Sequence, residues 1–243
     1  MLHSWQKPLS GERVGVVFGT FAPLHQGHLD LIYRAKKEND GGCIVIVCGF
    51  DGDKGEPMMS HAKRYRYVRE FFADDDLVAV YGINDTEIGA PMYPNGWPKW
   101  MKEFEKIWSK AVVDTMYGMT GDTVFDFGPE RVWYVGDANY ADDLARQNEK
   151  AILVDRIADN PICATMIRQN PIKHWDKITF PFRRLFSHNI LICGTASEGK
   201  SVMTADLGKY FNAPYSHEYA RDYMKESCVA DWELDGADFM AFL

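Results

Sequence analysis

The sequence predicts a doubly wound α/β protein with a Rossmann-like parallel sheet, on the strength of two observations. Short apolar runs rich in β-branched residues recur along the chain, and stretches with helical spacing separate them. The runs are apolar at nearly every position, as expected for parallel strands that helices cover on both faces. Ligands of such sheets bind at the carboxyl ends of the strands, so we expect the functional residues there.

Five runs are expected to be the strands of a first domain. They lie at 14–18 (VGVVF), 43–50 (CIVIVCGF), 77–83 (LVAVYGI), 131–137 (RVWYVGD) and 151–155 (AILVD). Between the first two, HLDLIYRAKKEND carries apolar residues at helical spacing, and the NDGG that ends at Gly42 stops it. AKRYRYVREFFADDD, before the third run, is a second amphipathic helix.

A second domain is expected after an aromatic, proline-punctuated connector. The segment NPIKHWDKITFPFRRLFSH leads to the apolar run NILICG at 189–194, which predicts a fresh strand followed by a turn and a helix. We therefore place a first domain at 1–182 and the start of a P-loop NTPase-type α/β domain at 187–243.

Composition excludes several classes of protein. Apolar residues make up 46% of the 243 residues, which predicts a folded chain, and the net charge of −8 argues against a general nucleic-acid binder. A small anionic ligand fits, because local basic residues and helix N-termini can hold one. The five cysteines form no C-x-x-C pair, which favours free thiols and a cytoplasmic location. No apolar run is long enough to cross a membrane.

The stretch GTFAPLHQGH, from Gly19 to His28, follows the first strand. Gly27 lets the backbone approach a ligand closely, and the imidazoles of His25 and His28 lie near the N-terminus of the next helix. This arrangement suits a polyphosphate. Histidines of a surface loop with no ligand are the alternative, and a metal site is disfavoured because no third ligand lies nearby at a suitable spacing.

The same stretch resembles the G-x-F-x-P-x-H-x-G-H signature of the nucleotidyltransferase superfamily, whose members join a nucleotide to a phosphorylated acceptor. The resemblance implies that His25 and His28 contact the phosphates of ATP and act in catalysis. It also places three residues of the turn at the ATP site: Gly19, Thr20 and Phe21.

A second element of that superfamily, I-S-x-T-x-I-R, is similar to ICATMIR at 162–168. The resemblance implies that Thr165 and Arg168 bind the β- and γ-phosphates at a helix N-terminus and that Arg168 assists catalysis. Cys163 stands where serine is usual, so one phosphate hydrogen bond is in doubt. A helix start with a surface arginine is the alternative.

The stretch YPNGWPKWMKEF places Trp97 and Trp100 in a loop rich in proline and glycine. Two such indoles can form a core lid, or they can stack on a cationic pyridinium ring. YPNGWPKW resembles the NadR-type branch of bifunctional nicotinamide-nucleotide adenylyltransferases and ribosylnicotinamide kinases. That likeness implies that Trp97 stacks on the nicotinamide ring and that Asp51 lies in the site for nicotinamide mononucleotide (NMN).

Other charged residues near these stretches are weaker candidates. Asp53 and Asp137 follow expected strands, but charged loop residues are usually only solvated. In the helix AKRYRYVRE, either Arg64 or Arg66 can reach a phosphate, although a basic face toward solvent is the favoured interpretation.

The second domain opens with NILICGTASEGKS, which has the P-loop spacing G-x-x-x-x-G-K-S between a strand and a helix. Its candidate nucleotide-binding residues are Gly194, Gly199, Lys200 and Ser201, with the Ser201 hydroxyl as a ligand of Mg²⁺. It resembles a ribosylnicotinamide kinase, which adds nicotinamide riboside as a ligand. No second strand with a metal-binding aspartate follows, so we expect weak nucleotide binding and no kinase activity from this 243-residue sequence.

Taken together, the resemblances imply transfer of the adenylyl group of ATP, with Mg²⁺, to NMN, giving NAD and pyrophosphate. Two alternatives stay open from the sequence. One is an adenylyltransferase for another acceptor, such as FMN or phosphopantetheine. The other is a sensor that binds pyridine nucleotides without turnover and regulates a partner.

Overall fold

The computed structural model describes residues 11–51, 59–119, 129–154, 162–188, 190–195, 197–216, 219–228 and 230–235. The chain divides into two compact units, which we call unit 1 (Met1–Ser187) and unit 2 (His188–Leu243).

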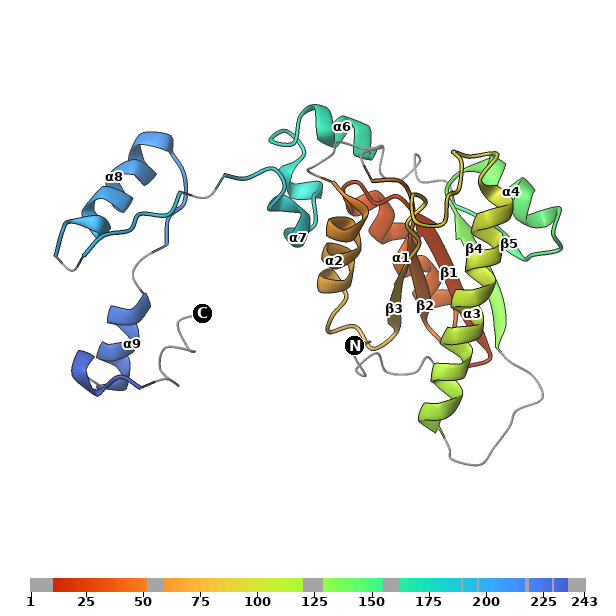
Figure 1. Ribbon diagram of the computed structural model, residues 1–243, viewed down its shortest axis with the longest axis horizontal. Helices are drawn as coiled ribbons and strands as arrows, with labels where there is room; N and C mark the ends of the chain where they lie inside the picture. The colour runs from red at the N-terminus through yellow and green to blue at the C-terminus, as the bar shows by residue number, and fades with distance from the viewer. Residues whose placement is uncertain are drawn as a thin grey trace. The chain divides into compact units, whose positions relative to one another are not determined.

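Unit 1 is built on a five-stranded, wholly parallel sheet (Figure 1). Its strands are β1 (Arg13–Gly19), β2 (Cys43–Val47), β3 (Val78–Gly82), β4 (Glu130–Val135) and β5 (Ala151–Leu153). The strand order is β3-β2-β1-β4-β5, so the chain winds outward from β1 in both directions. The predicted doubly wound fold is confirmed. At the carboxyl end, β1 runs one residue further than expected, and the other four strands end earlier than expected.

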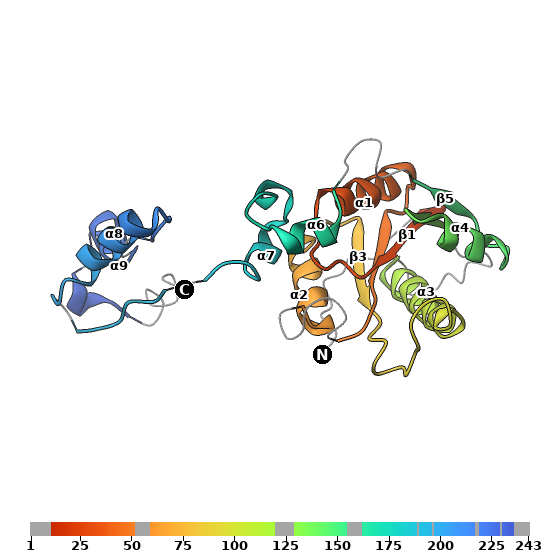
Figure 2. The same cartoon turned by 90° about the horizontal axis from the view of Figure 1, so that it is seen from above.

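Four helices of unit 1 connect these strands. They are α1 (Gln26–Glu38), α2 (His61–Phe71), α3 (Trp97–Met119) and α4 (Ala138–Ala145). Figure 2 shows α1 and α3 on opposite sides of the strands. In the described residues of unit 1 after β5, the helices are α6 (Ala164–Gln169), the 3₁₀ turn η1 (Trp175–Lys177) and α7 (Phe180–Arg183).

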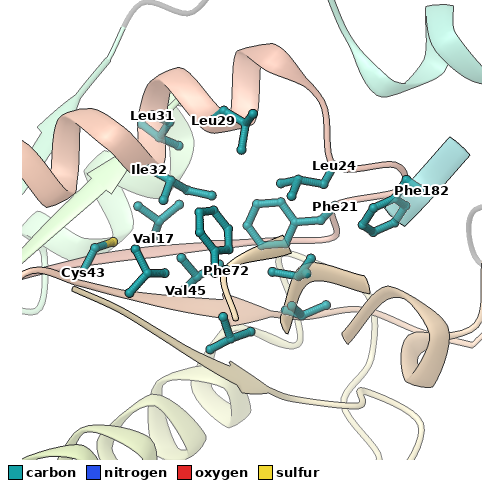
Figure 3. Packing of buried hydrophobic residues seen from close by; sticks show 14 of the residues in the cluster. Val17, Phe21, Leu24, Leu29, Leu31, Ile32, Cys43, Val45, Phe72 and Phe182 are labelled. Carbon is teal, nitrogen blue, oxygen red and sulfur yellow. The ribbon is translucent and has the colours of Figure 1, made fainter. Parts of the chain in front are cut away.

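Alternate residues of each central strand enter different hydrophobic cores. Val17 of β1 joins a core with α1, α2 and α7, part of which Figure 3 shows. Val16 and Phe18 join a second core with α3 and α4. This explains why the strand sequences are continuously apolar, because both of their faces are covered.

The segment after α6 belongs to unit 1 and extends beyond the expected boundary at residue 182. Both the backbone N–H and the hydroxyl of Thr179 donate to the carbonyl of Leu24, at 3.3 and 3.1 Å. Phe182 is fully buried in the same core as Leu24. This segment therefore packs against the turn between β1 and α1.

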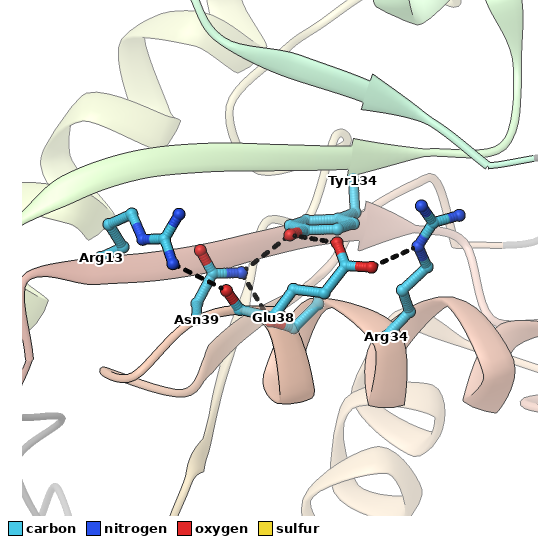
Figure 4. Close-up of polar contacts among 6 residues, drawn as sticks. Arg13, Arg34, Glu38, Asn39 and Tyr134 are labelled. Carbon is cyan, nitrogen blue, oxygen red and sulfur yellow. Dashed lines mark hydrogen bonds and ion pairs between the residues drawn. The ribbon is translucent and has the colours of Figure 1, made fainter.

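A polar network closes the amino-terminal end of the sheet (Figure 4). The Tyr134 hydroxyl of β4 donates to Glu38 at 2.9 Å and accepts a hydrogen bond from the Asn39 amide at 3.0 Å. The Arg34 guanidinium donates to the other carboxylate oxygen of Glu38. The hydrogen bonds from Arg34 and Tyr134 hold the pKa of Glu38 below its usual value. The end opposite the predicted site is thus well supplied with hydrogen-bond partners.

Unit 2 contains α8 (Lys200–Phe211), α9 (Tyr219–Ser227) and a 3₁₀ turn, η2 (Asp231–Glu233). The strand expected at 189–194 was a wrong prediction: residues 190–194 form no strand, and residue 189 lies outside the described residues. The part of unit 2 that the structure describes contains no strand to pair with, so the run lacks the ladder that defines a strand.

None of the helices in the described parts of the chain is long and apolar enough to span a membrane.

Candidate active site

A cavity of about 510 Å³ opens at the carboxyl ends of β1 and β4. These strands are neighbours, and the order of the sheet reverses between them. Doubly wound sheets bind their ligands at this kind of switch point. The lining comprises residues 18–22, His28, Leu31, Trp100, residues 135–137, Tyr140, Ala164, Thr165 and Arg168.

The cavity brings together most of the residues that the sequence assigned to ATP. Gly19, Thr20, Phe21, His28, Thr165 and Arg168 all line it. Two of these segments lie far apart in the sequence, and a hydrogen bond joins Arg168 to Ala22 across 146 positions. The binding of ATP by these residues stays a prediction, but their assembly into one cavity is a property of the fold.

The turn after β1 has an unusual backbone conformation at Phe21, whose φ is +47°. Bulky residues rarely adopt positive φ, so packing must hold Phe21 there. Its ring is 1% exposed and meets the His28 ring edge-on, with 5.0 Å between the centroids. A Cβ atom on Gly19 would lie 3.3 Å from the Phe21 ring, so glycine leaves room for this conformation.

The two histidines take different positions. His25 is the N-cap of α1 and is 2% exposed, and its Nδ1 accepts a hydrogen bond from the Gly27 backbone at 3.2 Å. Because Nδ1 accepts, the neutral ring carries its proton on Nε2. His28 lies one turn along α1, lines the cavity, and has its ring centroid 3.9 Å from that of His25. The buried His25 therefore supports the ring that faces the cavity.

Thr165 and Arg168 reach the cavity from α6. The Arg168 guanidinium donates to the Ala22 carbonyl at 2.6 Å and to the Thr165 hydroxyl at 3.1 Å. The bond to Ala22 holds α6 against the turn after β1. Cys163 is the N-cap of α6 and makes no side-chain capping hydrogen bond. The loss of a phosphate hydrogen bond at this position stays a prediction.

The two tryptophans lie on a helix, which corrects the loop expected from the proline and glycine around them. Trp97, Trp100, Met101 and Phe104 are all buried on one face of α3. Their spacing is i, i+3, i+4 and i+7, the pattern of a helix that faces a core. That signal is in the sequence and would have predicted the helix.

Trp100, rather than Trp97, lines the cavity. The Trp100 indole N–H donates to the Asp85 carboxylate at 2.9 Å, and Asp85 is 1% exposed. Trp97 is 6% exposed and stacks on Tyr140, with 5.9 Å between centroids and 15° between ring planes. Within the described residues, its indole N–H has no hydrogen-bond partner. The stacking role assigned to Trp97 stays a prediction, and it requires Trp97 to leave this position.

Phe18 and Tyr140 also line the cavity, and together with Trp100 they form what we call its aromatic wall. Neither Phe18 nor Tyr140 was singled out in the sequence. Their ring centroids are 5.1 Å apart. Tyr93 ties this wall to α4, because its hydroxyl donates to Asp143 at 2.8 Å, and burial together with that carboxylate raises the pKa of Tyr93 to about 12. Tyr140 follows the acidic turn after β4. Its position just beyond the carboxyl end of a strand is the sequence signal that could have identified it as a lining residue.

The acidic candidates are dispersed. Asp51 does not line the cavity; its carboxylate accepts from the His61 backbone at 2.7 Å and from the Asn84 amide at 3.1 Å, which lowers its pKa. Asp137 lines the cavity and caps α4 by accepting from the Asn139 backbone. Asp53 lies outside the described residues. An NMN-binding role for Asp51 stays a prediction.

The helix α2 differs from the expected solvent-facing basic helix at one residue. Arg66 is exposed as expected, but the Arg64 side chain is fully buried. Among the described residues, it donates hydrogen bonds to four backbone carbonyls.

The turn of unit 2 leads into α8, which begins at Lys200 after Gly199 in a left-handed conformation. The Lys200 ammonium donates to the Thr195 carbonyl at 2.6 Å, and the Thr195 backbone donates to Glu198 at 3.0 Å. Hydrogen bonds from Thr195 lower the pKa of Glu198. A cavity of about 470 Å³ within unit 2 includes Lys200 and Ser201. Nucleotide binding by Gly194, Gly199, Lys200 and Ser201 stays a prediction.

Across the described residues, histidine, cysteine and carboxylate side chains form no group of three or more that could hold a metal ion.

Comparison with known proteins gives a family match and several relatives. The cytidylyltransferase-like family model matches residues 16–170. The "Trifunctional NAD biosynthesis/regulator protein NadR" of Escherichia coli is 26% identical over 227 residues, which cover 89% of this chain and 51% of that protein. The protein of the same name from Salmonella typhimurium is 28% identical, with the same coverage. The chain therefore spans about half the length of these curated relatives.

A solved structure, titled "Crystal structure of NadR protein in complex with NR", is 34% identical and superposes with a TM-score of 0.62. The match covers 97% of this chain and 62% of that one. A second structure of a NadR protein, "in complex with NAD and AMP-PNP", has a TM-score of 0.60. A shorter stretch resembles a phosphopantetheine adenylyltransferase of Campylobacter concisus, at 39% identity over 67 residues.

Proposed function

The chain belongs to the cytidylyltransferase-like family, and on that premise we propose that unit 1 transfers the adenylyl group of ATP to NMN, giving NAD and pyrophosphate. The relatives that cover most of this chain are named for NAD biosynthesis. A solved relative was obtained with NAD and AMP-PNP, an analogue of ATP. These names support a pyridine nucleotide as product and an adenine nucleotide as donor.

One observation carries the proposal: His28, Thr165 and Arg168 line a single cavity at the switch point of the sheet. An imidazole, a hydroxyl and a guanidinium are hydrogen-bond donors for phosphate oxygens, and arginine binds two oxygens at once. Aromatic rings form the opposite wall. The cavity thus offers a polar side for a polyphosphate and an apolar side for a flat ring.

The reaction requires positioning and charge stabilisation, with no nucleophile from the protein. An oxygen of the NMN phosphate forms a bond to the α-phosphorus of ATP, and the bond from that phosphorus to the bridging oxygen of pyrophosphate breaks. Negative charge grows on the bridging oxygen and on the departing pyrophosphate. Donors held in place before the reaction lower the barrier because they need no rearrangement.

We assign the roles from the position of each residue. His28 lines the cavity on α1 and donates to the α- and β-phosphates, while His25 caps α1 and supports the His28 ring. Arg168 and Thr165 bind the β- and γ-phosphates from α6. The Arg168 guanidinium already bonds to the turn after β1, so its orientation is set before ATP arrives.

The nicotinamide ring is assigned to the aromatic wall. Trp100 and Tyr140 line the cavity, and indole faces attract a cationic pyridinium ring. Asp137 lies in the same lining and adds a negative charge near that ring. Substitution of each tryptophan in turn distinguishes this assignment from the assignment of the ring to Trp97.

Mg²⁺ enters as part of the MgATP substrate. Mg²⁺ usually keeps several waters and binds substrate phosphates with one or two carboxylates. The described residues fit this mode, since Asp137 supplies a carboxylate in the lining of the cavity. When bound, the ion neutralises charge on the leaving pyrophosphate.

The test is an assay of pyrophosphate release with ATP, Mg²⁺ and a panel of acceptors: NMN, its deamidated form, FMN and phosphopantetheine. We expect NMN to give the fastest release and NAD as the product by mass spectrometry. Faster pyrophosphate release with phosphopantetheine would show that phosphopantetheine, and not NMN, is the preferred acceptor. Binding of NMN or NAD with no release from any acceptor would favour a sensor.

For unit 2 we propose binding of a second nucleotide by the turn from Gly194 to Ser201. The support is the P-loop spacing, the left-handed Gly199 before α8, and the position of Lys200 at its first residue. The curated relatives are named trifunctional, and one solved relative was obtained with "NR". Phosphorylation of nicotinamide riboside is tested by measuring NMN made from nicotinamide riboside and ATP.

A further inference from the structure

Arg64 is a fully buried cation directly behind the turn that follows β1. Its side chain has no exposed surface. Its Nη1 donates to the carbonyl of Thr20 at 2.6 Å and to the carbonyl of Cys48 at 2.7 Å. Its Nη2 donates to Phe50 at 3.0 Å, and its Nε donates to Met59 at 3.0 Å. Four backbone carbonyls therefore surround one guanidinium.

Those carbonyls belong to three separate segments of unit 1. Thr20 is in the turn after β1, Cys48 and Phe50 follow β2, and Met59 precedes α2. Thr20 also lines the cavity, whereas Arg64 does not. Among the described residues, the hydrogen bond to the Thr20 carbonyl connects Arg64 to the lining of the cavity.

Gly49 makes room for this arrangement. Its φ is +111°, and a Cβ atom there would lie 3.5 Å from both Nη1 and Nη2 of Arg64 and 3.3 Å from Cγ2 of Thr20. Glycine adopts such a conformation without strain, and other residues do not. Gly49 and Arg64 therefore act as a pair that packs the ends of β1 and β2 together.

We propose that Arg64 is a positioning residue that holds the turn at Thr20 in the geometry required to bind the phosphates of ATP. This inference rests on the proposed function of unit 1. Carbonyls at strand ends point along the strands, and several that converge repel one another unless a donor lies between them. A guanidinium has five donors in a fixed plane, so it can join carbonyls from different segments.

Lysine is a poor replacement, because it keeps the charge but lacks the planar fork. The substitution Arg64→Lys therefore separates geometry from charge. We expect the dissociation constant for MgATP, measured by calorimetry, to rise about tenfold. The KM for NMN in the pyrophosphate assay should stay within twofold of the wild-type value. Arg66→Lys is the matched control, because Arg66 lies on the same helix and is exposed.

An ATP affinity of Arg64→Lys within twofold of wild type would overturn the proposal, as would equal losses for ATP and NMN. If Arg64→Lys fails to fold by circular dichroism, Gly49→Ala decides, since it strains the backbone beside Thr20 and the guanidinium and leaves the charge. It should weaken ATP selectively. Loss of the fold in both variants would show that the cluster maintains the domain rather than the turn, and would overturn the proposal.

The binding measurement also separates this inference from the proposed function. A wild-type chain that binds MgATP but releases no pyrophosphate contradicts adenylyl transfer, while the comparison of Arg64→Lys with wild type stays decisive. A wild-type chain that does not bind MgATP contradicts both.

Discussion

The two glycine-rich turns of this chain share a sequence pattern but differ in their surroundings. The turn after β1 has Leu24 at 0% exposure and His25 at 2%, and donors from Arg64, Thr179 and Arg168 bind its backbone. The turn before α8 follows a run in which Leu191 is 86% exposed. Its Lys200 bonds to a carbonyl of the same turn.

The difference shows what a strand-turn-helix pattern requires. In unit 1, β1 lies between β2 and β4, so both ends of its turn are fixed by neighbouring segments. In the described part of unit 2, residues 190–194 pair with no strand. In this chain, the glycine-rich turn that follows a paired strand is held by donors from other segments of unit 1.

The largest expected effect is on stability. Leu24→Ala removes a fully buried side chain and should lower the free energy of unfolding of unit 1 by about 3 kcal/mol. The matched change Leu191→Ala should alter stability by less than about 0.5 kcal/mol, because that side chain is exposed. Urea unfolding followed by tryptophan fluorescence measures both. Similar losses in the two variants would remove the contrast between the turns.

The next effect is on catalysis. His28→Ala should lower kcat/KM for adenylyl transfer roughly 10²-fold or more, the scale seen when a transition-state donor is lost. The fold should persist, because His28 lies at the open end of the sheet. Lys37→Ala, an exposed change on the same helix, is the control. Wild-type turnover by His28→Ala would remove this residue from the mechanism.

A smaller effect distinguishes the two tryptophans. Trp100→Phe should raise the KM for NMN about tenfold and leave the KM for ATP nearly unchanged, because a desolvated indole–pyridinium contact contributes about 1–2 kcal/mol. Trp97→Phe, at a residue stacked on Tyr140, should change both values equally and slightly. The reverse result would return the ring contact to Trp97, as the sequence resemblance predicts.

The smallest effect is expected in unit 2. Lys200→Ala should weaken nucleotide binding at the second turn by less than about tenfold, since charge interactions at exposed sites are weak. Lys209→Ala, at the other end of α8, is the control. Calorimetry on the Arg64→Lys background, where the first site is expected to bind MgATP more weakly, measures this binding. A loss of more than a hundredfold would indicate a prearranged site and contradict the contrast between the turns.

The sequence predicted the fold well where its signals were local and repeated. Continuous apolar runs identified all five strands of the sheet, and the switch point followed from the class of fold. The assembly of His28 with Arg168 was also anticipated, although only through a family resemblance. Spacing alone does not bring together residues so far apart in the chain.

Three features were missed, each for a physical reason. Arg64 was expected at the surface because arginine is rarely buried, and its four carbonyl partners come from other segments. The proline and glycine before Trp97 concealed the start of α3, although its buried face has helical spacing. The run at 189–194 has strand composition, but composition supplies no pairing partner.

The strand order also determines the order in which the strands can pair while the chain is being synthesised on the ribosome. Gly15 pairs with Cys43, so β1, β2 and β3 can associate early in translation. On its other side, Arg13 pairs with Glu130, and the cavity additionally needs Arg168. A nascent chain that ends before β4 therefore exposes one edge of β1 to other chains. Within unit 1, the cavity is completed only after Arg168 has been synthesised. Until β4 is available, the edge of β1 that pairs with it stays unpaired.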